Sequence, residues 1–422
     1  MIETTRNWAG NITYSAARLH YPETVAQVRH LVTQHRKLKV QGARHSFTDI
    51  ADSPEDLISL DHFEPTVAVD AIHRTVTISG SVRYEQLCAG LHQAGFALHN
   101  MASLPHVSVA GACATGTHGS GVGNGNLATA VAAMEVVTGT GDVVVFSREQ
   151  HGEQFHGAVI GLGGLGIVTR LTLDIQPTFD MRQDVYENLP LAQVVDHFDP
   201  IFSGAYSVSL FTDWRGPRFN QVWLKRRVTD TAAREAPPVW FEATRATRQH
   251  DPVGDAAEDC TGQLGVPGPW HERLPHFRMA YMPERGQELQ SEYMVPRQHA
   301  VAALQALDRL RDHVAPHLQM SEIRTIAADS LWMSPCYQQA SIALHFTWKP
   351  DWPAVSQLLP TIEEELTPLG ARPHWGKLFT MPAARVQSLY AKLPDFQQLL
   401  RNHDPQGKFR NRFLDTYIFG TG

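Results

Sequence analysis

The sequence predicts an α+β fold in two domains, and three observations support this prediction. The first 175 or so residues alternate helical and strand-like patterns, with hairpins that a purely doubly wound fold would not need. The character of the chain changes near residue 178, where paired strands and a long irregular stretch begin. We therefore expect a first domain at 1–177, a second domain at 178–375, and a C-terminal segment at 376–422 that returns to the first domain.

The first domain is predicted element by element from the spacing of its apolar residues. Residues 22–37 carry apolar side chains on one helical face, and residues 83–95 form a second helix that a glycine closes. Residues 74–80 alternate as a strand. Residues 133–146 are two strands around a Gly-Asp turn, and residues 166–177 are one long strand that a proline stops.

The second domain is expected to combine strands and helices around an irregular stretch. Thr229–Pro275 is rich in Pro, Gly, Ala and charged residues, which indicates an insertion or a surface wrap. Alternating patterns predict strands at 205–214, 221–228, 321–327 and 341–348. Helical periodicity predicts helices at 297–314 and near 354–366.

The composition excludes several classes of function. The 422-residue chain is 43% hydrophobic and 19% charged, which is ordinary for a globular protein. A net charge of −7 without a basic face gives no basis for nucleic-acid binding. No apolar run approaches the ~20 residues that cross a bilayer, and the N-terminal "MIETTRNWAGN" lacks a signal-peptide layout. Because the four cysteines are dispersed, with no CxxC, we expect a soluble cytoplasmic protein.

A glycine-rich segment at Ser108–Asn126, "SVAGACATGTHGSGVGNGN", is the first candidate for binding chemistry. Glycines allow main-chain N–H groups to approach a large anionic ligand and to surround its phosphates. A flexible linker is the alternative, but Val109, Ala112 and Ala114 are suited to packing. We favour a pyrophosphate-binding cradle.

A second glycine segment, "GLGGLG" at 161–166, matches the GxGxxG pattern of nicotinamide-binding folds. Such a motif must follow a strand and open a helix. Here a helical pattern precedes it and a strand follows it, so the motif fails this test of context. A role in packing or in a turn beside a cofactor is the better interpretation.

Polar side chains gather on two predicted strands and one loop. Glu322 and Arg324 are two residues apart on a strand, so they share a face, and His345 and Thr347 do the same on the next strand. The loop "RPHWGK" adds Arg372, His374 and Lys377. The alternatives are a solvent-exposed sheet face with an incidental ion pair and a basic surface turn. Together the three segments predict a pocket for a hydroxylated, uncharged substrate.

Metal-dependent hydrolysis and non-catalytic polyol binding are the competing classes of function. The chain has 22 histidines, but no HxxxH or HExxH spacing lies on a predicted helix. Glu322, His345 and His374 could still meet in space, which leaves a metallohydrolase open. No GxSxG motif is present, which argues against an α/β-hydrolase.

The chain resembles the alditol oxidases, which are vanillyl-alcohol-oxidase-type flavoproteins with close relatives that act on sugar lactones. The resemblance runs nearly end to end from Asn7, and the "SLPHVSVAG" and "HFTW" contexts favour alditols over lactones. The segments that carry it are, in order, "GARHSF", "NMASLPHVSVAGACATGTHGSG", "EYMVPR", "EIRT", "HFTW" and "RPHWGK".

The resemblance implies a two-domain FAD-binding fold of the vanillyl-alcohol-oxidase (PCMH) type, with a substrate domain of antiparallel sheet and helices. It further implies that FAD is joined covalently to His45, since a neutral imidazole nitrogen is nucleophilic near physiological pH. Arg44 departs from the small residue that is usual beside this histidine, and we assign it no specific role. The residues implied around FAD are His45, Gly42, Arg44, Ser46, Ser108, Gly111, Thr115, Gly116, Thr117, His118, Val168 and His374.

The implied activity is oxidation of the terminal CH2OH of alditols such as xylitol and sorbitol. The aldose would form by hydride transfer to flavin N5, with O2 reduced to H2O2. Nothing in the sequence demands more than a monomer, so we expect one. A sugar-1,4-lactone oxidase or dehydrogenase on the same scaffold remains the main alternative. By the same resemblance, the polyol would contact Ser103, Glu322, Arg324, Thr347 and Lys377. The residues implied in catalysis are Arg324, Lys377 and His345.

Overall fold

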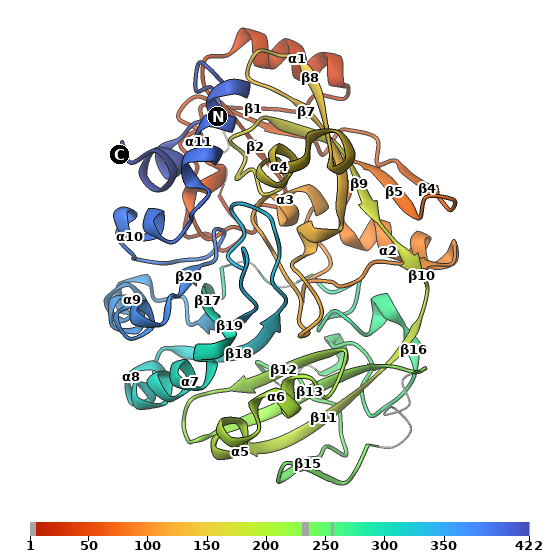
Figure 1. Cartoon of the computed structure of the whole chain (residues 1–422), viewed down its shortest axis with the longest axis vertical. Coiled ribbons are helices and arrows are strands. Elements are labelled where there is room, and N and C mark those ends of the chain that lie inside the picture. Colours follow the sequence, from red (N-terminus) through yellow and green to blue (C-terminus); the bar gives the residue numbers. More distant parts are fainter. Residues whose placement is uncertain (1–5, 230–235, 255–256, 283, 285, 422) are drawn as a thin grey trace.

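The computed structural model divides into two halves that meet along a broad interface (Figure 1). One half holds the N-terminal strands and the glycine-rich segment, and the other is built on a single large sheet. The structure describes residues 6–229, 236–254, 257–282, 284 and 286–421.

The first half contains two principal sheets. A small parallel sheet has the strand order β1-β3-β2, and an antiparallel five-stranded sheet has the order β4-β5-β9-β7-β8. The strands of the parallel sheet are β1 (Arg18–His20), β2 (Leu38–Gln41) and β3 (Asp56–Ser59). Those of the antiparallel sheet are β4 (Val67–Asp70), β5 (Thr75–Ser79), β7 (Val131–Val137), β8 (Val143–Ser147) and β9 (Ile167–Asp174).

Four helices pack around these sheets. The N-cap Thr24 accepts a hydrogen bond from the Gln27 amide and opens α1, which buries Val28 and Val32. Gly95, with a φ of 84°, follows the end of α2, as the sequence predicts. The helices are α1 (Val25–Gln34), α2 (Tyr84–Gln93), α3 (Val109–Ala114) and α4 (Arg148–Val159).

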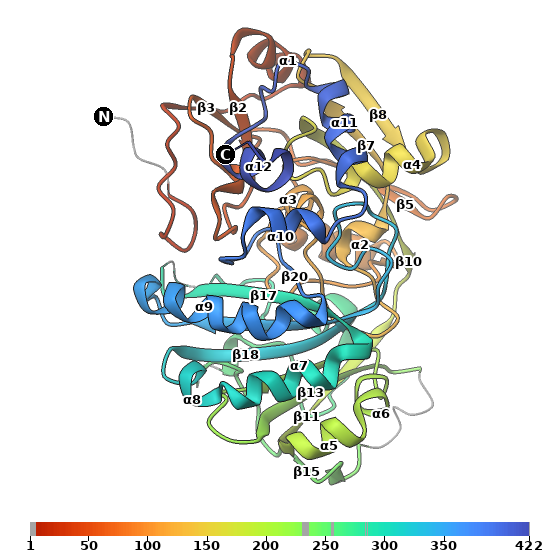
Figure 2. The same ribbon diagram turned by 60° about the vertical axis from the view of Figure 1, so that its left-hand side comes forward.

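The second half is a ten-stranded antiparallel sheet in which β18 and β19 lie side by side near the middle. Helices cover one face of it (Figure 2), and the opposite faces of β17, β18 and β19 contribute side chains to a cavity. The longer strands are β11 (Asp180–Pro190), β12 (Ser207–Thr212), β13 (Arg218–Arg227), β17 (Leu289–Pro296), β18 (Leu318–Ile326) and β19 (Ser341–Trp348). The short ones are β14 (Val239–Trp240), β15 (Ala243–Arg245), β16 (Gly268–Pro269) and β20 (Arg372–Pro373). The helices are α5 (Leu191–Asp196), α6 (Phe198–Phe202), α7 (Ala300–Arg309), α8 (Arg311–Val314) and α9 (Trp352–Leu366).

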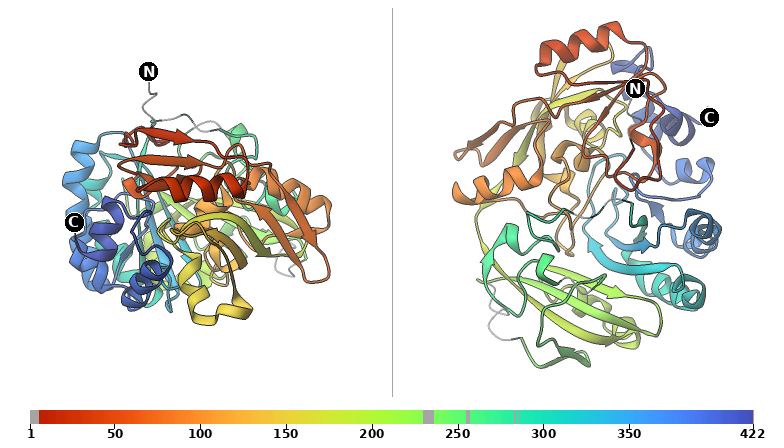
Figure 3. Two further views of the ribbon diagram at one scale, coloured as in Figure 1. Left: turned by 90° about the horizontal axis from the view of Figure 1, so that it is seen from above. Right: turned by 180° about the vertical axis from the view of Figure 1, so that it is seen from behind.

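After β20 the chain lies against the first half again (Figure 3). The amide of Asn411 donates hydrogen bonds to the carbonyls of Asp49, Ile50 and Asp52, which ties the C-terminal segment to the loop before β3. Its elements are α10 (Ala383–Ser388), α11 (Leu393–His403), α12 (Arg412–Leu414) and a π-helical turn at Asp415–Phe419. The division into parts at 1–177, 178–375 and 376–422 stays our proposal.

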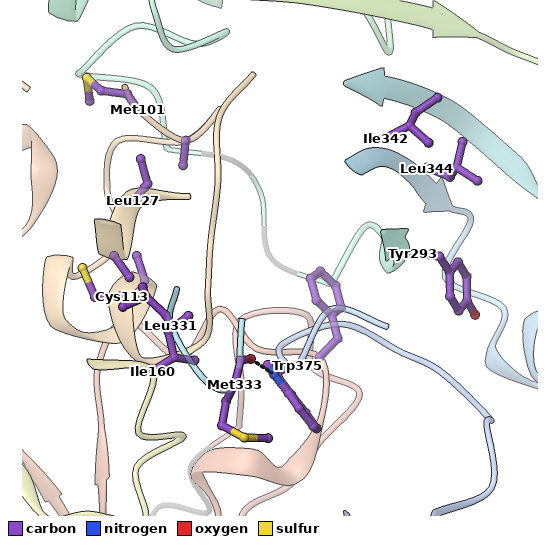
Figure 4. Packing of buried hydrophobic residues seen from close by; sticks show 14 of the residues in the cluster. Met101, Cys113, Leu127, Ile160, Tyr293, Leu331, Met333, Ile342, Leu344 and Trp375 are labelled. Carbon is purple, nitrogen blue, oxygen red and sulfur yellow. Dashed lines mark hydrogen bonds between the residues drawn. The ribbon is translucent and has the colours of Figure 1, made fainter. Parts of the chain in front are cut away.

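Both halves share one hydrophobic core (Figure 4). Met101 and Cys113 of the first half and Ile342 and Leu344 of β19 belong to the same buried cluster. The loop between β18 and β19 lies between the halves, where the Met333 carbonyl accepts a 2.7 Å hydrogen bond from the Trp375 indole. Because this interface is packed with apolar side chains, it holds the residues of the two halves in fixed relative positions.

The α+β fold and the antiparallel sheet of the second half are confirmed, and a few predicted elements are divided differently. The single strand predicted at 166–177 is split, because its last residues form β10 (Gln176–Pro177) and pair with β6 (Phe96–Ala97) instead of β5. The helix predicted at 297–314 begins as a 3-10 turn and breaks at Leu310 into α7 and α8.

The predicted irregular stretch, Thr229–Pro275, contains the short strands β14, β15 and β16. Its residues 230–235 and 255–256 lie outside the described residues. In the part of the chain that the structure describes, no helix combines the length and apolar character needed to span a membrane.

Candidate active site

A cavity of about 480 Å³ lies where the two halves meet. On the first-half side its wall is formed by the turn after β2, the glycine-rich segment with α3, and the loop after α4. On the second-half side it is formed by β17, β18, β19 and the loop at 374–377. The cavity therefore joins the two sets of residues that the sequence singles out.

The floor of the cavity is a polar row across three neighbouring strands. In the register of the sheet, His345 of β19 pairs with Glu292 of β17 on one side and with Glu322 of β18 on the other. Thr347 lies two residues further along β19 and shares this face. Ile323, between Glu322 and Arg324, points into the core and is fully buried, as the predicted alternation requires. The alternative of a solvent-exposed sheet face is wrong, because all eight residues of β19 are buried.

The carboxylate of Glu292, at one end of this row, is fully buried and contacts several charged groups. Its Oε1 accepts a 2.9 Å hydrogen bond from Nη2 of Arg324 and lies 3.2 Å from Nε2 of His118. Its Oε2 accepts a 2.6 Å hydrogen bond from Nζ of Lys377. One carboxylate thus holds two cations that come from different elements, at the position where the two halves face each other.

The charges in this cluster stabilise one another. Burial alone would raise the pKa of Glu292, but Lys377, His118 and Arg324 outweigh burial and hold that pKa well below its ordinary value. Burial lowers the pKa of Lys377, and the neighbouring Glu292 carboxylate opposes this shift. Glu292 is consequently ionised at neutral pH and carries no proton that it could donate.

His345 joins Lys377 to Thr347. Nζ of Lys377 donates to Nδ1 of His345 over 2.9 Å, and Nε2 of His345 lies 3.0 Å from Oγ1 of Thr347. Burial, followed by the charge of Lys377, keeps the pKa of His345 well below its ordinary value, so the ring is neutral. Since an ammonium group only donates, Nδ1 is the acceptor and Nε2 carries the proton.

Two aromatic rings hold His45 in place on the other side of the cavity. The indole of Trp8 stacks on the imidazole at 4.4 Å, and Nε2 of His106 lies 2.6 Å from Nε2 of His45. Burial, and next the neighbouring His106, lower the pKa of His45 to about 3, so its ring is neutral. The preceding residue, Arg44, has a left-handed backbone with a φ of 59° and lines the cavity.

The turn after β2 and the start of α3 are close enough that only small residues fit between them. A Cβ atom at Gly42 would lie 2.3 Å from Oγ of Ser108, and one at Gly111 would lie 2.7 Å from the same atom. Main chain therefore forms the wall here, as a large phosphate-bearing ligand requires. The glycine-rich segment is less open than its composition suggests, because residues 109–114 form α3.

Most of the residues predicted around a flavin lie on this side of the cavity and fit such a group, whereas His374 belongs to the loop on the second-half side. Gly116 is the exception, since it does not line the cavity and its Cα instead faces Pro335. The turn at 161–166 does line it, and Nζ of Lys39 holds that turn through the carbonyls of Leu162 and Gly163. The predicted flavin-side residues that line the cavity are His45, Gly42, Arg44, Ser46, Ser108, Gly111, Thr115, Thr117, His118, Val168 and His374.

The residues predicted around the substrate also line the cavity. Nε of Arg324 is buried without a hydrogen-bond partner, 3.5 Å from Oε2 of Glu322, so a donor remains for a ligand. Arg372 is not part of the site, because its guanidinium group donates to the carbonyls of Pro335 and Tyr337. The predicted substrate-side and catalytic residues that line the cavity are Ser103, Glu322, Arg324, His345, Thr347 and Lys377.

The sequence assigned no role to two residues that line the cavity, Glu292 and His276, or to His106, which contacts His45. Gln290 and Glu292 alternate on β17 with the buried residues Leu289, Ser291 and Tyr293, a pattern that could have indicated a second polar face. His106 follows a proline in a loop, and His276 follows the irregular stretch, so neither has a periodic signal.

A metal centre built from Glu322, His345 and His374 finds no support in the geometry. Among the described residues, the group of three side chains close enough to hold an ion is His20, His35 and Asp56, whose ligand atoms lie within 4.8 Å of one another. None of these three lines the cavity.

Comparisons with known proteins give matches in both halves of the chain. A family model described as "FAD binding domain" matches residues 16–147, and one described as "D-arabinono-1,4-lactone oxidase" matches residues 278–417. Mouse L-gulonolactone oxidase is 25% identical over 98% of both chains. The structure of cholesterol oxidase from Brevibacterium sterolicum superimposes with a TM-score of 0.77, covers 98% of this chain and 96% of its own, and shares 14% identity.

A curated relative from Streptomyces, named alditol oxidase, is 49% identical over the full length of both chains. This identity and the matched FAD-binding segment show that the chain belongs to the alditol oxidase family of FAD-dependent oxidoreductases.

Proposed function

We propose that the protein oxidises the terminal CH2OH of an alditol, such as xylitol or sorbitol, to the aldose, with O2 reduced to H2O2. The single observation that carries this proposal is the buried Glu292 cluster, which directs Arg324 and Lys377 into a cavity beside neutral His45. The 49% identity to a relative named alditol oxidase supports the choice of substrate.

FAD would be held in the first-half part of the cavity, by main chain at Gly42 and Gly111 and by the turn at 161–166. When bound, FAD supplies the hydride acceptor and passes the electrons to O2. We propose that His45 tethers it covalently. The stacked Trp8 restricts the motion of the His45 ring, and the low pKa leaves one of its two ring nitrogens unprotonated, as a nucleophile must be.

Arg324 and Lys377 would stabilise the charge that develops on the reacting hydroxyl oxygen. Oxidation removes the hydroxyl proton as well as the hydride, and both hydrogens end in H2O2. As the proton leaves, the oxygen gains alkoxide character, so fixed cations stabilise the transition state more than the ground state. Glu292 fixes both cations before substrate arrives, because each donates to one of its two oxygens. His345 then acts by positioning, since its two ring nitrogens face Lys377 and Thr347.

Glu322, Ser103 and Thr347 would bind the remaining hydroxyl groups of the polyol. A carboxylate accepts from a hydroxyl, while a serine or threonine hydroxyl can both donate and accept. A site with buried polar groups rejects analogues that lack the matching hydroxyls, because those groups would then stay unpaired. Long polyols are therefore expected to be better substrates than simple alcohols.

A cytoplasmic location and a monomeric state are part of the same proposal. The four cysteines, Cys88, Cys113, Cys260 and Cys336, are all free and buried, which suits a reducing compartment. Oligomeric state stays a prediction.

Oxidation of a sugar-1,4-lactone is the second candidate function. It is favoured by the family match at residues 278–417 and by the relatives named L-gulonolactone oxidase. These relatives are about half as similar to the chain as the Streptomyces alditol oxidase is, at 25% against 49% identity.

The substrate class is tested by peroxide formation. We expect xylitol and sorbitol to be oxidised with kcat/KM at least ~10-fold above that for L-gulono-1,4-lactone, because the cavity offers hydroxyl-binding groups along its floor. The measurement is a coupled peroxidase assay at several substrate concentrations. A higher kcat/KM for the lactone would contradict alditol oxidation and favour the second candidate.

His45→Ala is expected to lose the covalent flavin. Acid precipitation of the wild-type protein should give a yellow pellet, whereas the variant should release its FAD into the supernatant, because no other residue forms the bond. His30→Ala, at an exposed histidine on α1, is the matched control and should keep a yellow pellet. A colourless wild-type pellet would show that the tether does not exist.

Lys377→Met is expected to slow turnover of xylitol on the order of 100-fold while the protein keeps its bound flavin, since removal of one charge-stabilising donor typically costs ~3 kcal/mol. Steady-state kcat and the visible spectrum measure the two properties. Lys349→Met, at an exposed lysine after β19, should leave both unchanged. Wild-type turnover in Lys377→Met would remove this lysine from the mechanism.

A further inference from the structure

A fully buried lysine lies behind the cavity, where the proposed mechanism makes no use of it. Lys225 is on β13 and has no exposed surface. Its Nζ donates to the carbonyl oxygens of Leu274 and Pro275 at 2.6 and 2.9 Å, and lies 3.2 Å from Nδ1 of His276. A buried ammonium group is costly unless all its donors are satisfied, and here three acceptors match its three N–H groups.

These contacts fix which nitrogen of His276 carries the proton. Burial alone would raise the pKa of Glu322, but Arg324 and His276 outweigh burial and hold that pKa well below its ordinary value, so its carboxylate can only accept. Nε2 of His276 therefore donates to it, and Nδ1 is left to accept from Nζ of Lys225. Burial lowers the pKa of His276 to about 4, so the ring is neutral and its single proton is on Nε2. That Nε2 donates to Oε1 of Glu322 over 2.7 Å.

The orientation of the His276 ring is fixed as well. The rings of Phe211 and Trp223 contact it edge to face, at 5.4 and 5.2 Å between centroids. Its main-chain carbonyl accepts a hydrogen bond from the Thr261 amide over 2.9 Å. The ring therefore has no freedom to turn its nitrogens away from Glu322.

The same segment also holds Ser103. The main-chain amides of His276 and Phe277 both approach the Ser103 carbonyl, at 3.3 and 3.4 Å. Residues 274–277 thus connect Lys225 to two of the residues proposed to bind the polyol, Glu322 and Ser103. Arg324 is the neighbour of Glu322 on its other side, where Nε lies 3.5 Å from Oε2.

We propose that Lys225 and His276 are positioning residues for Glu322, and that they set the recognition of polyol hydroxyls. Lys225 holds His276 in the tautomer that donates from Nε2. That donor occupies Oε1 of Glu322 and leaves the rest of the carboxylate to accept from a substrate hydroxyl. This inference rests on the proposed function, in which Glu322 binds the polyol.

Two substitutions of His276 test the proposal in the holoenzyme. Gln places an amide N–H close to where Nε2 of histidine lies, whereas Leu fills similar space and donates nothing. We expect His276→Leu to raise the KM for xylitol at least ~10-fold with kcat within about twofold of wild type, because a hydrogen bond to a charged group is lost. His276→Gln should keep the KM within about threefold of wild type.

Lys225→Met provides the second arm, since it removes the charge and keeps the volume. Without Lys225, Nδ1 of His276 loses its partner and the ring is held less firmly against Glu322, so the KM for xylitol should rise about threefold or more. In a His276→Gln background the same change should have no further effect on KM, because glutamine has no Nδ1 for Lys225 to hold. His271→Leu, at a buried histidine outside the cavity, is the matched control and should leave KM unchanged.

The outcomes separate this inference from the function on which it rests. A wild-type enzyme that oxidises no polyol overturns both. If the wild-type enzyme is active and His276→Leu leaves the KM unchanged, the positioning role alone is overturned. An equal loss of kcat in the Gln and Leu variants, with the KM preserved, overturns it as well. An unchanged visible flavin spectrum in each variant establishes that the cofactor site is intact.

Discussion

The candidate site depends on one buried negative charge, the carboxylate of Glu292. A carboxylate without solvent is strongly unfavourable unless cations and donors surround it. Here Arg324 comes from β18, Lys377 from the loop after β20 and His118 from the glycine-rich segment. The need to compensate this charge therefore brings three separate parts of the chain together. It also leaves two cations fixed beside a cavity before any substrate is bound.

Main-chain hydrogen bonds connect this cluster to the flavin side of the cavity. The carbonyl of Glu292 accepts from the amide of His374 over 3.0 Å, which fixes the start of the loop that carries Lys377. The carbonyl of Gly376, in the same loop, accepts from the amide of Phe47 over 2.8 Å. Phe47 follows the turn that holds His45. One main-chain hydrogen bond therefore connects the segment of the proposed tether to the loop that carries Lys377, and another connects this loop to Glu292. The shared hydrophobic core holds these segments in fixed relative positions.

The parts of the site that could be predicted from sequence are those governed by local rules. The period of two along a strand is local. It put Glu322 and Arg324 together on one face of β18, and His345 and Thr347 together on one face of β19, and in the structure both pairs line the cavity. Glycines at places where main chain must approach a ligand were likewise visible in the sequence, and Gly42 lies where a side chain would collide with Ser108.

The parts that could not be predicted depend on contacts between distant segments. Glu292 meets His345 only through the register of β17 against β19, and His276 reaches Glu322 only because a long irregular stretch ends beside β13. Proximity in the sequence gave a wrong prediction for Arg372. This residue is two positions from His374, but its guanidinium group donates to carbonyls outside the cavity. Strand pairing is non-local, and hydrophobic periodicity carries no information about it.

The most direct measurement is the rate at which xylitol bleaches the bound flavin of a Glu292→Gln variant in the absence of oxygen. Glutamine keeps the shape of the side chain but removes the charge that fixes Arg324 and Lys377. Reduction slower than wild type by on the order of 100-fold, in a protein that keeps its yellow colour, is the result that the account predicts. Reduction at the wild-type rate would mean that the two cations are organised without this carboxylate, and would contradict the account.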